Sequence, residues 1–361
     1  MVKAAVLMKQ GGPLEVRDIS LGDPGPGQVK VRVHAAGVCH SDLSLANGTL
    51  LQEVPAVLGH EGAGVVIAVG DGVDRVAVGD HVVLNWAPAC RECWFCLQGE
   101  PWLCAHAEDV ARAPYATLAS GKDVGTPVYP GLGTGAFAEE TVVPANGVVK
   151  VPDSVPMAHA AVLGCAVQTG AGAVLNTARV RAGESVVVVG LGGVGLSALQ
   201  AARAVGAGPI IGVDVSEAKA DLALQHGATD FLVSTETTAK AARLLTGGRG
   251  ADHAFDCVGL PATIRMAWSA SRRGGSVTVV GVGSKANVVE FSALELYWFG
   301  RTLHGCVFGS SDPDVEIPRL LGLVEDGKLD LAALASATTD LAGVNDAFDR
   351  LGTGARTIVR L

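Results

Sequence analysis

The sequence has 361 residues, which is too long for one ordinary domain and predicts two. Hydrophobic residues make up 49% of the chain and charged residues only 17%, so there is ample apolar material for two cores. The net charge of −9 and the absence of a lysine- or arginine-rich block argue against nucleic acid or an anionic membrane as a partner. Residues 1–10 predict a first strand and turn rather than a signal peptide, and no uninterrupted apolar stretch reaches membrane-spanning length, so we expect a cytoplasmic enzyme.

The segment 1–85 predicts short strands separated by turns, as in residues 29–33, where apolar and charged side chains alternate. Two glycine-framed turns carry reactive side chains. Residues 37–42 contain Cys39, His40, Ser41 and Asp42, and residues 58–64 contain His60 and Glu61. Either cluster alone would more often be packing, but two of them are what a metal site assembled from separate loops needs.

Four cysteines give the strongest metal signal, in the spacing C-x2-C-x2-C-x7-C: Cys90, Cys93, Cys96 and Cys104. Two-residue gaps let a turning backbone aim thiolates at one ion, and four thiolates close a tetrahedral zinc site, which would be structural. The alternatives are a C-x-x-C redox pair or an iron–sulfur cluster. The first explains only two of the four cysteines, and the second has no evident electron partner here, so we favour zinc.

Residues 105–130 show no regular pattern and predict a loop, which we expect over the mouth of the active site. Residues 131–140 predict a return to strand, and residues 170–175 the start of a helix that joins the two domains. Taken alone, Cys165 is interpreted as a small buried hydrophobic residue, as are Cys257 and Cys306.

Residues 185–195 are the centre of the second half of the chain. The apolar run 186–189 predicts a buried strand, the segment that follows fits G-x-G-x-x-G with Gly190, Gly192 and Gly195, and residues 196–205 predict a helix. In a dinucleotide-binding unit these glycines give a tight turn, approach to a pyrophosphate and close helix–strand packing. Asp214 ends the next strand, where it can bind an adenosine ribose and would repel a 2′-phosphate, so NAD is favoured over NADP. A glycine-rich turn in an ordinary α/β sheet is the alternative.

The alternation of strands and helices then continues, which predicts a doubly wound parallel sheet of six strands. After residues 186–189 and 210–213, strands are expected at 231–233, 254–258, 277–280 and 303–307, with helices at 217–224, 238–245 and 262–271. The remaining residues, up to a closing strand at 357–361, have no place in such a sheet and are expected to return to the first domain.

Together these motifs occur in the order and spacing of zinc-containing medium-chain alcohol dehydrogenases, which the chain resembles from Val2 to Arg360. The long segment 105–130 resembles the dimeric animal-type and thiol-dependent formaldehyde dehydrogenase branch. The resemblance implies a mainly-β GroES-like catalytic domain with a structural-zinc lobe, at residues 1–166 and 308–361, and a Rossmann domain at 167–307. It also implies NAD, two zinc ions per chain and a homodimer, with a tetramer possible.

The resemblance implies roles for individual residues. Cys39, His60 and Cys165 match the ligands of a catalytic zinc, Glu61 matches the acid behind it, and Asp42 matches the carboxylate that holds the ligating histidine. Ser41 matches the hydroxyl that takes the substrate proton, and His40 and Arg356 match two cations that hold the pyrophosphate. Other cofactor contacts are implied at Thr169, Gly190, Gly192, Gly193, Val194, Gly195, Asp214, Lys219, Val258, Val280 and Val282.

One departure concerns the proton relay. Family members often carry a histidine three residues after the hydroxyl residue, and here that residue is Ser44. Since serine cannot hold the proton as imidazole does, we expect the relay to end through water or another base, with a slower or more pH-sensitive proton step.

The activity that the resemblance implies is hydride transfer between NAD and a primary alcohol held on zinc. We expect a medium-sized hydrophobic alcohol, benzylic or terpenoid-like, since Gly131 stands where animal enzymes often have a bulky aromatic residue. An S-(hydroxymethyl)thiol of the mycothiol type is the alternative, although only Arg112 and Lys122 are candidates to bind an anionic thiol. A non-catalytic NAD-binding sensor is the third hypothesis. The pocket positions implied are apolar: Leu50, Trp86, Gly131, Leu132 and Val307.

Overall fold

The computed structural model describes residues 1–361, and its contacts divide the chain into two compact units. The first unit contains Met1–Cys165, Asp312–Pro318 and Ala335–Leu361, and the second contains Ala166–Ser311 and Arg319–Leu334. Part of the segment expected in the first domain therefore packs with the second unit. There the side chain of Gln200 donates to the Asp330 carbonyl (3.1 Å) and accepts from the Asp330 amide (2.7 Å).

The first unit is mainly β. Five strands close a barrel in the order β1 (Val2–Leu7), β2 (Leu14–Leu21), β7 (Ala116–Leu118), β8 (Pro127–Pro130) and β4 (Ala56–Val57). The second sheet of this unit has seven strands. Six follow the order β10 (Val148–Lys150), β6 (His81–Leu84), β5 (Glu61–Val69), β3 (Gln28–Val38), β18 (Thr357–Arg360) and β17 (Ala337–Thr339), and β9 (Glu140–Pro144) also pairs with β3. The chain's last strand lies antiparallel to β3, with Thr357 opposite Val38.

Two local predictions in this unit are wrong. Residues 105–130 are not one loop, because β7 and β8 pair within them and complete the barrel. Residues 131–139 are not a strand, and β9 begins only at Glu140. They form a short 3-10 turn at Gly131–Gly133 and a buried loop, because the amides of Ala136 and Phe137 bond to the carbonyls of Gly59 and Leu58. Local sequence could not show these partners, which come from a distant part of the chain.

A continuous helical stretch, Met157–Thr177, joins the two units and begins well before the predicted start at residue 170. It consists of α3 (Met157–Val162), a π-type turn at Leu163–Val167, α4 (Gln168–Gly172) and a second π-type turn at Ala173–Thr177. It is long and apolar enough to cross a membrane by length and composition, but 83% of its most apolar window is buried inside the protein. Such burial is that of a core helix.

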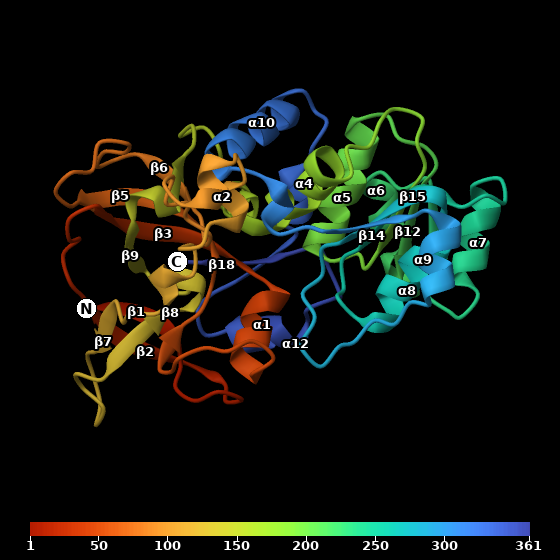
Figure 1. The fold of residues 1–361 in the computed structure, drawn as a ribbon. Helices are drawn as coiled ribbons and strands as arrows, with labels where there is room; N and C mark the ends of the chain where they lie inside the picture. Colours follow the sequence, from red (N-terminus) through yellow and green to blue (C-terminus); the bar gives the residue numbers. More distant parts are fainter. The chain divides into compact units, whose positions relative to one another are not determined.

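The second unit has the predicted doubly wound fold (Figure 1). Its six strands are all parallel, in the order β13 (Asp230–Val233), β12 (Ile210–Asp214), β11 (Val186–Val189), β14 (Ala251–Asp256), β15 (Ser271–Val279) and β16 (Thr302–Gly305). The sheet is covered by α5 (Gly193–Ala204), α6 (Ala220–Gln225), α7 (Thr238–Leu245), α8 (Pro261–Ala270) and α9 (Ala293–Phe299). The strand order reverses beside β11, and such a switch point is where open α/β sheets bind their ligands.

The other helices flank these sheets. In the first unit, α1 (His40–Asn47) follows β3, α2 (Trp94–Leu97) lies between the second and fourth of the four clustered cysteines, and α12 (Val344–Asp349) precedes β18. Helix α10 (Pro313–Glu325) begins in the first unit and ends in the second, which also contains α11 (Leu331–Leu334).

Candidate metal centres and nucleotide site

Asp42 organises the first group of reactive side chains. Its carboxylate is fully buried and accepts three hydrogen bonds, from the Cys39 amide (3.1 Å), the Gly59 amide (3.0 Å) and the His60 ring nitrogen Nδ1 (2.9 Å). Because Nδ1 donates to the carboxylate, the other ring nitrogen, Nε2, is free to bind a metal. One side chain thus fixes the end of β3, the turn before β5 and the tautomer of His60.

Close packing brings the remaining donors to this place. Gly59 has φ +90°, and a Cβ there would lie 2.6 Å from the Phe137 ring, so only glycine allows the turn that presents His60. A Cβ on Gly164 would lie 2.7 Å from the Leu84 carbonyl oxygen, so glycine lets the joining helix approach β6 and positions Cys165. Cys165 itself lies in the π-type turn, a feature that is frequent at functional sites.

The result is a buried group of four possible metal ligands. The donor atoms of Cys39, His60, Glu61 and Cys165 all lie within 4.8 Å of one another. The Cys165 thiol, by hydrogen bonding, lowers the pKa of Cys39 well below that of an ordinary thiol, while the same bond and burial raise the pKa of Cys165. A metal ion bound here would take both sulfurs as thiolates and displace any remaining thiol proton.

The residues fit a zinc ion. His60 Nε2 and Glu61 Oε2 are buried polar atoms with no hydrogen-bond partner, and both belong to the four-residue group. Unpartnered buried polar atoms are costly unless a further ligand binds them. Two sulfurs and one imidazole nitrogen are a common catalytic zinc set, which leaves a fourth position for a substrate.

Glu61 forms an ion pair that the sequence did not indicate. Its Oε1 accepts from Arg356 at 2.8 Å, and Arg356 also donates to the Val38 carbonyl (3.2 Å). Burial raises the pKa of Glu61 to about 7, although the guanidinium opposes the shift. Arg356 is only 7% exposed, and its predicted contact with the pyrophosphate stays a prediction. Only the pairing of β18 with β3 brings these residues together, 295 positions apart.

The four clustered cysteines form a second group, with donor atoms again within 4.8 Å of one another. The sulfurs of Cys90 and Cys96, and those of Cys93 and Cys104, are 4.0 Å apart, near the separation of about 3.8 Å expected for tetrahedral Zn–S bonds of about 2.3 Å. Backbone amides donate to these sulfurs, for example Cys93 to Cys90 at 3.2 Å. None of the eight cysteines of the chain forms a disulfide.

Arg91 attaches this cysteine lobe to the start of α10. It has φ +65° within the Cys90–Cys93 turn, and its guanidinium binds both oxygens of Asp312 and one of Asp314 (2.7 Å). Bidentate pairs of this kind fix orientation as well as proximity. The Cys90–Cys93 turn is therefore fixed to the segment at the start of α10 through Arg91.

The glycine-rich loop of the second unit has the geometry that its pattern requires. Gly190 has φ +89°, and a Cβ on Gly195 would lie 1.9 Å from the Gly190 carbonyl oxygen. A Cβ on Gly192, in contrast, would meet no atom within 4 Å, so the backbone there is open to a ligand. Gly192 is also the N-cap of α5, at the positive end of the helix dipole.

Asp214 and Lys219 lie close to this loop. The Asp214 carboxylate accepts from the amides of Leu191 (2.8 Å) and Ser216 (3.1 Å), so it supports the loop at the end of β12. Lys219 is 1% exposed and donates to the Leu191 carbonyl (2.9 Å); burial lowers its pKa, although Asp214 opposes the shift. The lysine thus points into the loop, not outward.

The other predicted cofactor residues differ in exposure. His40 is exposed at the start of α1, while Thr169 is buried and its hydroxyl has no partner. Gly193 and Val194 form the first turn of α5. Val280 is buried, whereas Val258 and Val282 are 37% and 60% exposed. The structure leaves their roles as predictions.

The pocket positions divide between the units. Leu50 and Leu132 pack against the core of the first unit, in which Trp86 is half-buried, and Val307 is exposed in the second unit. Leu132 is left-handed at φ +48°, and so are Phe308 and Ser310 just after Val307; such strain is common at binding sites. At Gly131 a Cβ would lie 2.9 Å from the Leu58 Cα, so this glycine is needed for packing, and the argument that it widens the channel loses support.

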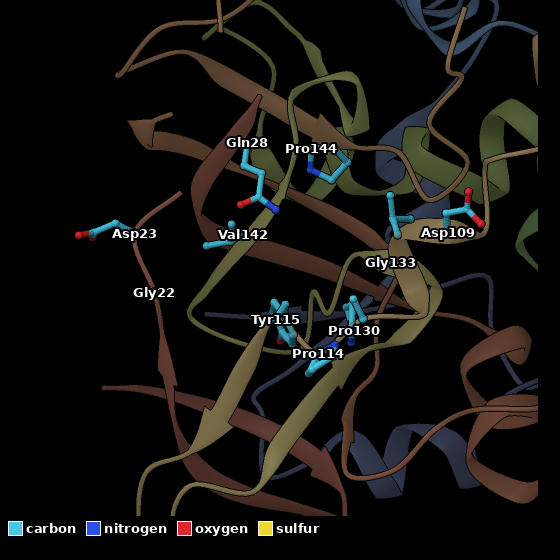
Figure 2. Close-up of a pocket in the computed structure, with 12 residues that line it drawn as sticks. Gly22, Asp23, Gln28, Asp109, Pro114, Tyr115, Pro130, Gly133, Val142 and Pro144 are labelled. Carbon is cyan, nitrogen blue, oxygen red and sulfur yellow. The ribbon is translucent and has the colours of Figure 1, made fainter. Parts of the chain in front are cut away.

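A separate hollow of about 320 Å³ opens in the first unit beside Tyr115, Pro130 and Pro144 (Figure 2). Its lining contains none of the eight clustered metal-ligand candidates. The hollow is therefore distinct from both candidate metal centres.

Comparisons with known proteins agree with this geometry. Residues 25–153 match the family described as alcohol dehydrogenase GroES-like domain, and residues 193–326 match the family described as zinc-binding dehydrogenase. The S-(hydroxymethyl)glutathione dehydrogenase of Paracoccus denitrificans is 35% identical, covering 98% of this chain and 97% of its own.

Two solved structures are also similar. An alcohol dehydrogenase zinc-binding domain protein from Burkholderia ambifaria is 36% identical, with a TM-score of 0.93, and covers 100% of this chain and 98% of its own. The benzyl alcohol dehydrogenase of Acinetobacter calcoaceticus is 32% identical, with a TM-score of 0.91, and covers 100% and 99%.

The predicted family, fold, enzyme class and cofactors are thus confirmed. The two donor groups account for zinc, and the Rossmann unit of this dehydrogenase family accounts for NAD. The hypothesis of a non-catalytic sensor, which needs a missing donor, loses its basis because all the donors are present. The chain belongs to the zinc-containing medium-chain alcohol dehydrogenases and is a zinc-dependent oxidoreductase.

Proposed function

We propose that the enzyme oxidises medium-sized hydrophobic primary alcohols, benzylic ones above all, to aldehydes with NAD, and catalyses the reverse reaction. The observation that carries the reaction is the group formed by Cys39, His60 and Cys165, held in place through Asp42. The substrate class is supported by the similarity to a benzyl alcohol dehydrogenase over the whole chain and by the apolar side chains at the proposed pocket positions.

In this proposal Cys39, His60 and Cys165 hold the catalytic zinc, and Cys90, Cys93, Cys96 and Cys104 hold the structural one. When bound, zinc supplies a Lewis acid for the substrate oxygen and NAD supplies the hydride acceptor. Asp42 keeps His60 in the tautomer with Nε2 available, and the ion pair with Arg356 keeps Glu61 behind the site.

Ser41 takes the alcohol proton at its Oγ, which lies 3.9 Å from the Cys39 sulfur. Ser44 is three residues further on in α1, one helical turn along the same face. Because a hydroxyl does not store a proton near pH 7, the proton leaves from Ser41 through water or another base. The glycine-rich loop from Gly190 to Gly195 binds the NAD pyrophosphate, with Asp214 on the adenosine ribose.

The second candidate substrate is an S-(hydroxymethyl)thiol, favoured by the 35% identity to an S-(hydroxymethyl)glutathione dehydrogenase. An anionic thiol would need free cations. Arg112 is 71% exposed, but Glu108 and Asp109 lie 3.8 Å and 3.5 Å from its guanidinium, which reduces its value for a carboxylate of the thiol. Lys122 is exposed and has no such neighbours among the ion pairs of the chain. Because only one of the two candidate cations is thus free of a carboxylate, benzylic alcohols remain our first choice.

The test is NAD reduction, followed by absorbance, with benzyl alcohol, a terpenoid alcohol, ethanol and formaldehyde with and without mycothiol or glutathione. We expect kcat/KM for benzyl alcohol to exceed that for ethanol at least tenfold. Activity with formaldehyde only when a thiol is present, together with no benzyl alcohol oxidation, would support the second candidate instead.

A matched pair of variants connects the activity to the site. His60→Gln should abolish turnover and leave NAD binding intact, whereas His34→Gln, an exposed position on β3, should leave both unchanged. Unaltered turnover in His60→Gln would refute the assignment of the catalytic centre.

We also propose that the enzyme is a homodimer formed through β16. This strand is at the edge of the six-stranded sheet and pairs only with β15, and Leu303 on it is 45% exposed. Beside it in sequence, Tyr297 and Trp298 of α9 are 81% and 59% exposed. An exposed apolar edge of this kind is a liability unless it is covered. Light scattering should give twice the chain mass, and Leu303→Asp should reduce it to one chain mass.

Finally, we propose a cytoplasmic location. None of the eight cysteines forms a disulfide, and the cysteines of both metal centres bind zinc only in reduced form, which reducing surroundings maintain. Fractionation of cells that express the protein, with an antibody readout, should place it with cytoplasmic markers.

A further inference from the structure

A basic hollow of about 380 Å³ lies in the second unit, away from the nucleotide loop. Its lining consists of Arg243 at the end of α7, Gly248 and Arg249 in the turn that follows, Arg272 and Arg273 at the start of β15, and Phe299 at the end of α9. Helices α7 and α9 can be followed in Figure 1. Because the hollow adjoins the first residues of β15, it is at the amino edge of the sheet, opposite the carboxyl edge that carries Gly190 and Asp214.

The positive charges at this hollow have few counter-ions. Two carboxylates reach the cluster: Asp252 pairs with Arg272, and Glu295 pairs with Arg265 at 3.0 Å. The guanidiniums of Arg243, Arg249, Arg273 and the adjacent Arg301 have no carboxylate within salt-bridge distance. Because the whole chain has a net charge of −9, this local excess of positive charge does not reflect a generally basic protein.

Several of these guanidiniums are fixed by neutral contacts. Arg243 donates to the Ser269 carbonyl (2.9 Å), and Arg301 donates to the Ser271 carbonyl (2.7 Å). Arg301 also lies 4.4 Å from the centre of the Phe299 ring, and Arg273 lies 5.4 Å from that of Trp298. These contacts orient the charges without neutralising them.

The cluster is unfavourable for the protein alone. Burial, and then the neighbouring charge of Arg243, lower the pKa of Arg301 to about 10. Like charges in a partly desolvated place repel one another, and an anion that bridges them removes this repulsion. Planar guanidinium forks are well suited to bind phosphate oxygens in pairs.

We propose that this hollow binds a small, multiply charged oxyanion, namely pyrophosphate or the phosphate groups of a phosphorylated metabolite. The volume excludes a large polyanion from the interior, and the ring of Phe299 is already covered by guanidiniums and so offers no face for a base. The site is independent of the dehydrogenase reaction and of its NAD cradle.

The probe is sodium pyrophosphate, titrated calorimetrically into the zinc-loaded enzyme at constant ionic strength. The enzyme is saturated with NAD, so that the nucleotide loop cannot bind the probe. We expect one site per chain with orthophosphate weaker, and binding at least tenfold weaker in the double variant Arg249→Gln/Arg273→Gln. Both arginines are exposed, and Arg249 makes no ring contact, whereas Arg273 lies over the rings of Trp298 and Phe299.

Arg179→Gln is the matched control, since Arg179 is exposed in the same unit but does not line the hollow. The Arg179→Gln variant should bind pyrophosphate with the affinity of the wild-type enzyme. An unchanged affinity for NAD and an unchanged mass by light scattering show that the double variant is folded and still forms the proposed dimer. No binding to the NAD-saturated enzyme, or equal binding by the double variant, would overturn the proposal. Binding of poly-glutamate without binding of pyrophosphate would also overturn it, because the site would then select an acidic peptide.

Discussion

Replacing Asp42 by asparagine tests whether one carboxylate holds the catalytic zinc site together. The carboxylate accepts from Cys39, Gly59 and His60 with both of its oxygens. Asparagine has nearly the same shape but offers one acceptor oxygen and one NH2 group. In either orientation at least one buried N–H then faces another donor.

The magnitude follows from these contacts. A buried donor without a partner costs about 1–3 kcal/mol, so we expect a loss of that size in the free energy of unfolding. Loss of the carboxylate that orients a ligating histidine typically reduces metal affinity about 10- to 100-fold. Only one of the two zinc ions should be affected, because no atom of the Cys90–Cys104 lobe contacts Asp42 through a hydrogen bond.

The assay is competition with a chromogenic zinc chelator. The wild-type enzyme should release its zinc ions at high chelator concentration, and Asp42→Asn should release one of them at about 10- to 100-fold lower concentration, with a parallel loss of activity. NAD binding should persist, since the nucleotide loop is in the other unit.

The exposed Asp153→Asn, in the same unit, serves as the control and should behave as the wild type. If Asp42→Asn retained both ions at wild-type affinity with the same unfolding free energy, the proposed role of the carboxylate would be refuted.

Three further predictions concern other parts of the chain. Gly192→Ala should unfold like the wild type in urea, because the added Cβ meets no protein atom, yet it should bind NAD at least tenfold more weakly, because the Cβ occupies the space left for the pyrophosphate. Gly195→Ala should instead lose about 3 kcal/mol of stability, since its Cβ would lie 1.9 Å from the Gly190 carbonyl oxygen. Cys96→Ser should reduce the zinc content measured by atomic emission to one ion per chain and leave NAD affinity unchanged. Burial raises the pKa of Asp252, but hydrogen bonds from Ser185 outweigh it and lower this pKa to about 2. Because the carboxyl pKa is lower in the folded than in the unfolded chain, the ionised Asp252 stabilises the fold above about pH 4, and this stabilisation is lost as the pH falls towards 2. Asp252→Asn should therefore lower the unfolding free energy by about 1–2 kcal/mol at pH 7, and urea titrations should show this difference shrinking between pH 4 and pH 2.

Short-range chemistry explains why much of the second unit could be predicted from sequence. A buried strand, a glycine-rich turn and a helix repeat along the chain, and each strand pairs with others through the same parallel geometry. The helix at Thr238–Leu245 begins and ends where it was predicted, and most other boundaries shift by a few residues, as for the strand expected at 254–258 that runs from Ala251 to Asp256. The strand expected at 277–280 instead begins at Ser271, and the helix at Ala293–Phe299 was not predicted. The cysteine site could likewise be predicted from sequence, because all four sulfurs come from the short segment between Cys90 and Cys104 and need no distant partner.

The sequence by itself thus determined the Rossmann unit, the cysteine lobe and, through its motifs, the family. Only the tertiary structure decided what depends on distant partners: the strands within residues 105–130, the pairing of Glu61 with Arg356, the inward position of Lys219 and the lack of space at Gly131. The physical reason is that hydrogen bonding and packing between remote segments leave no local pattern. A side chain's charge and size can be read from its residue type, but its partner is chosen only when the sheets close.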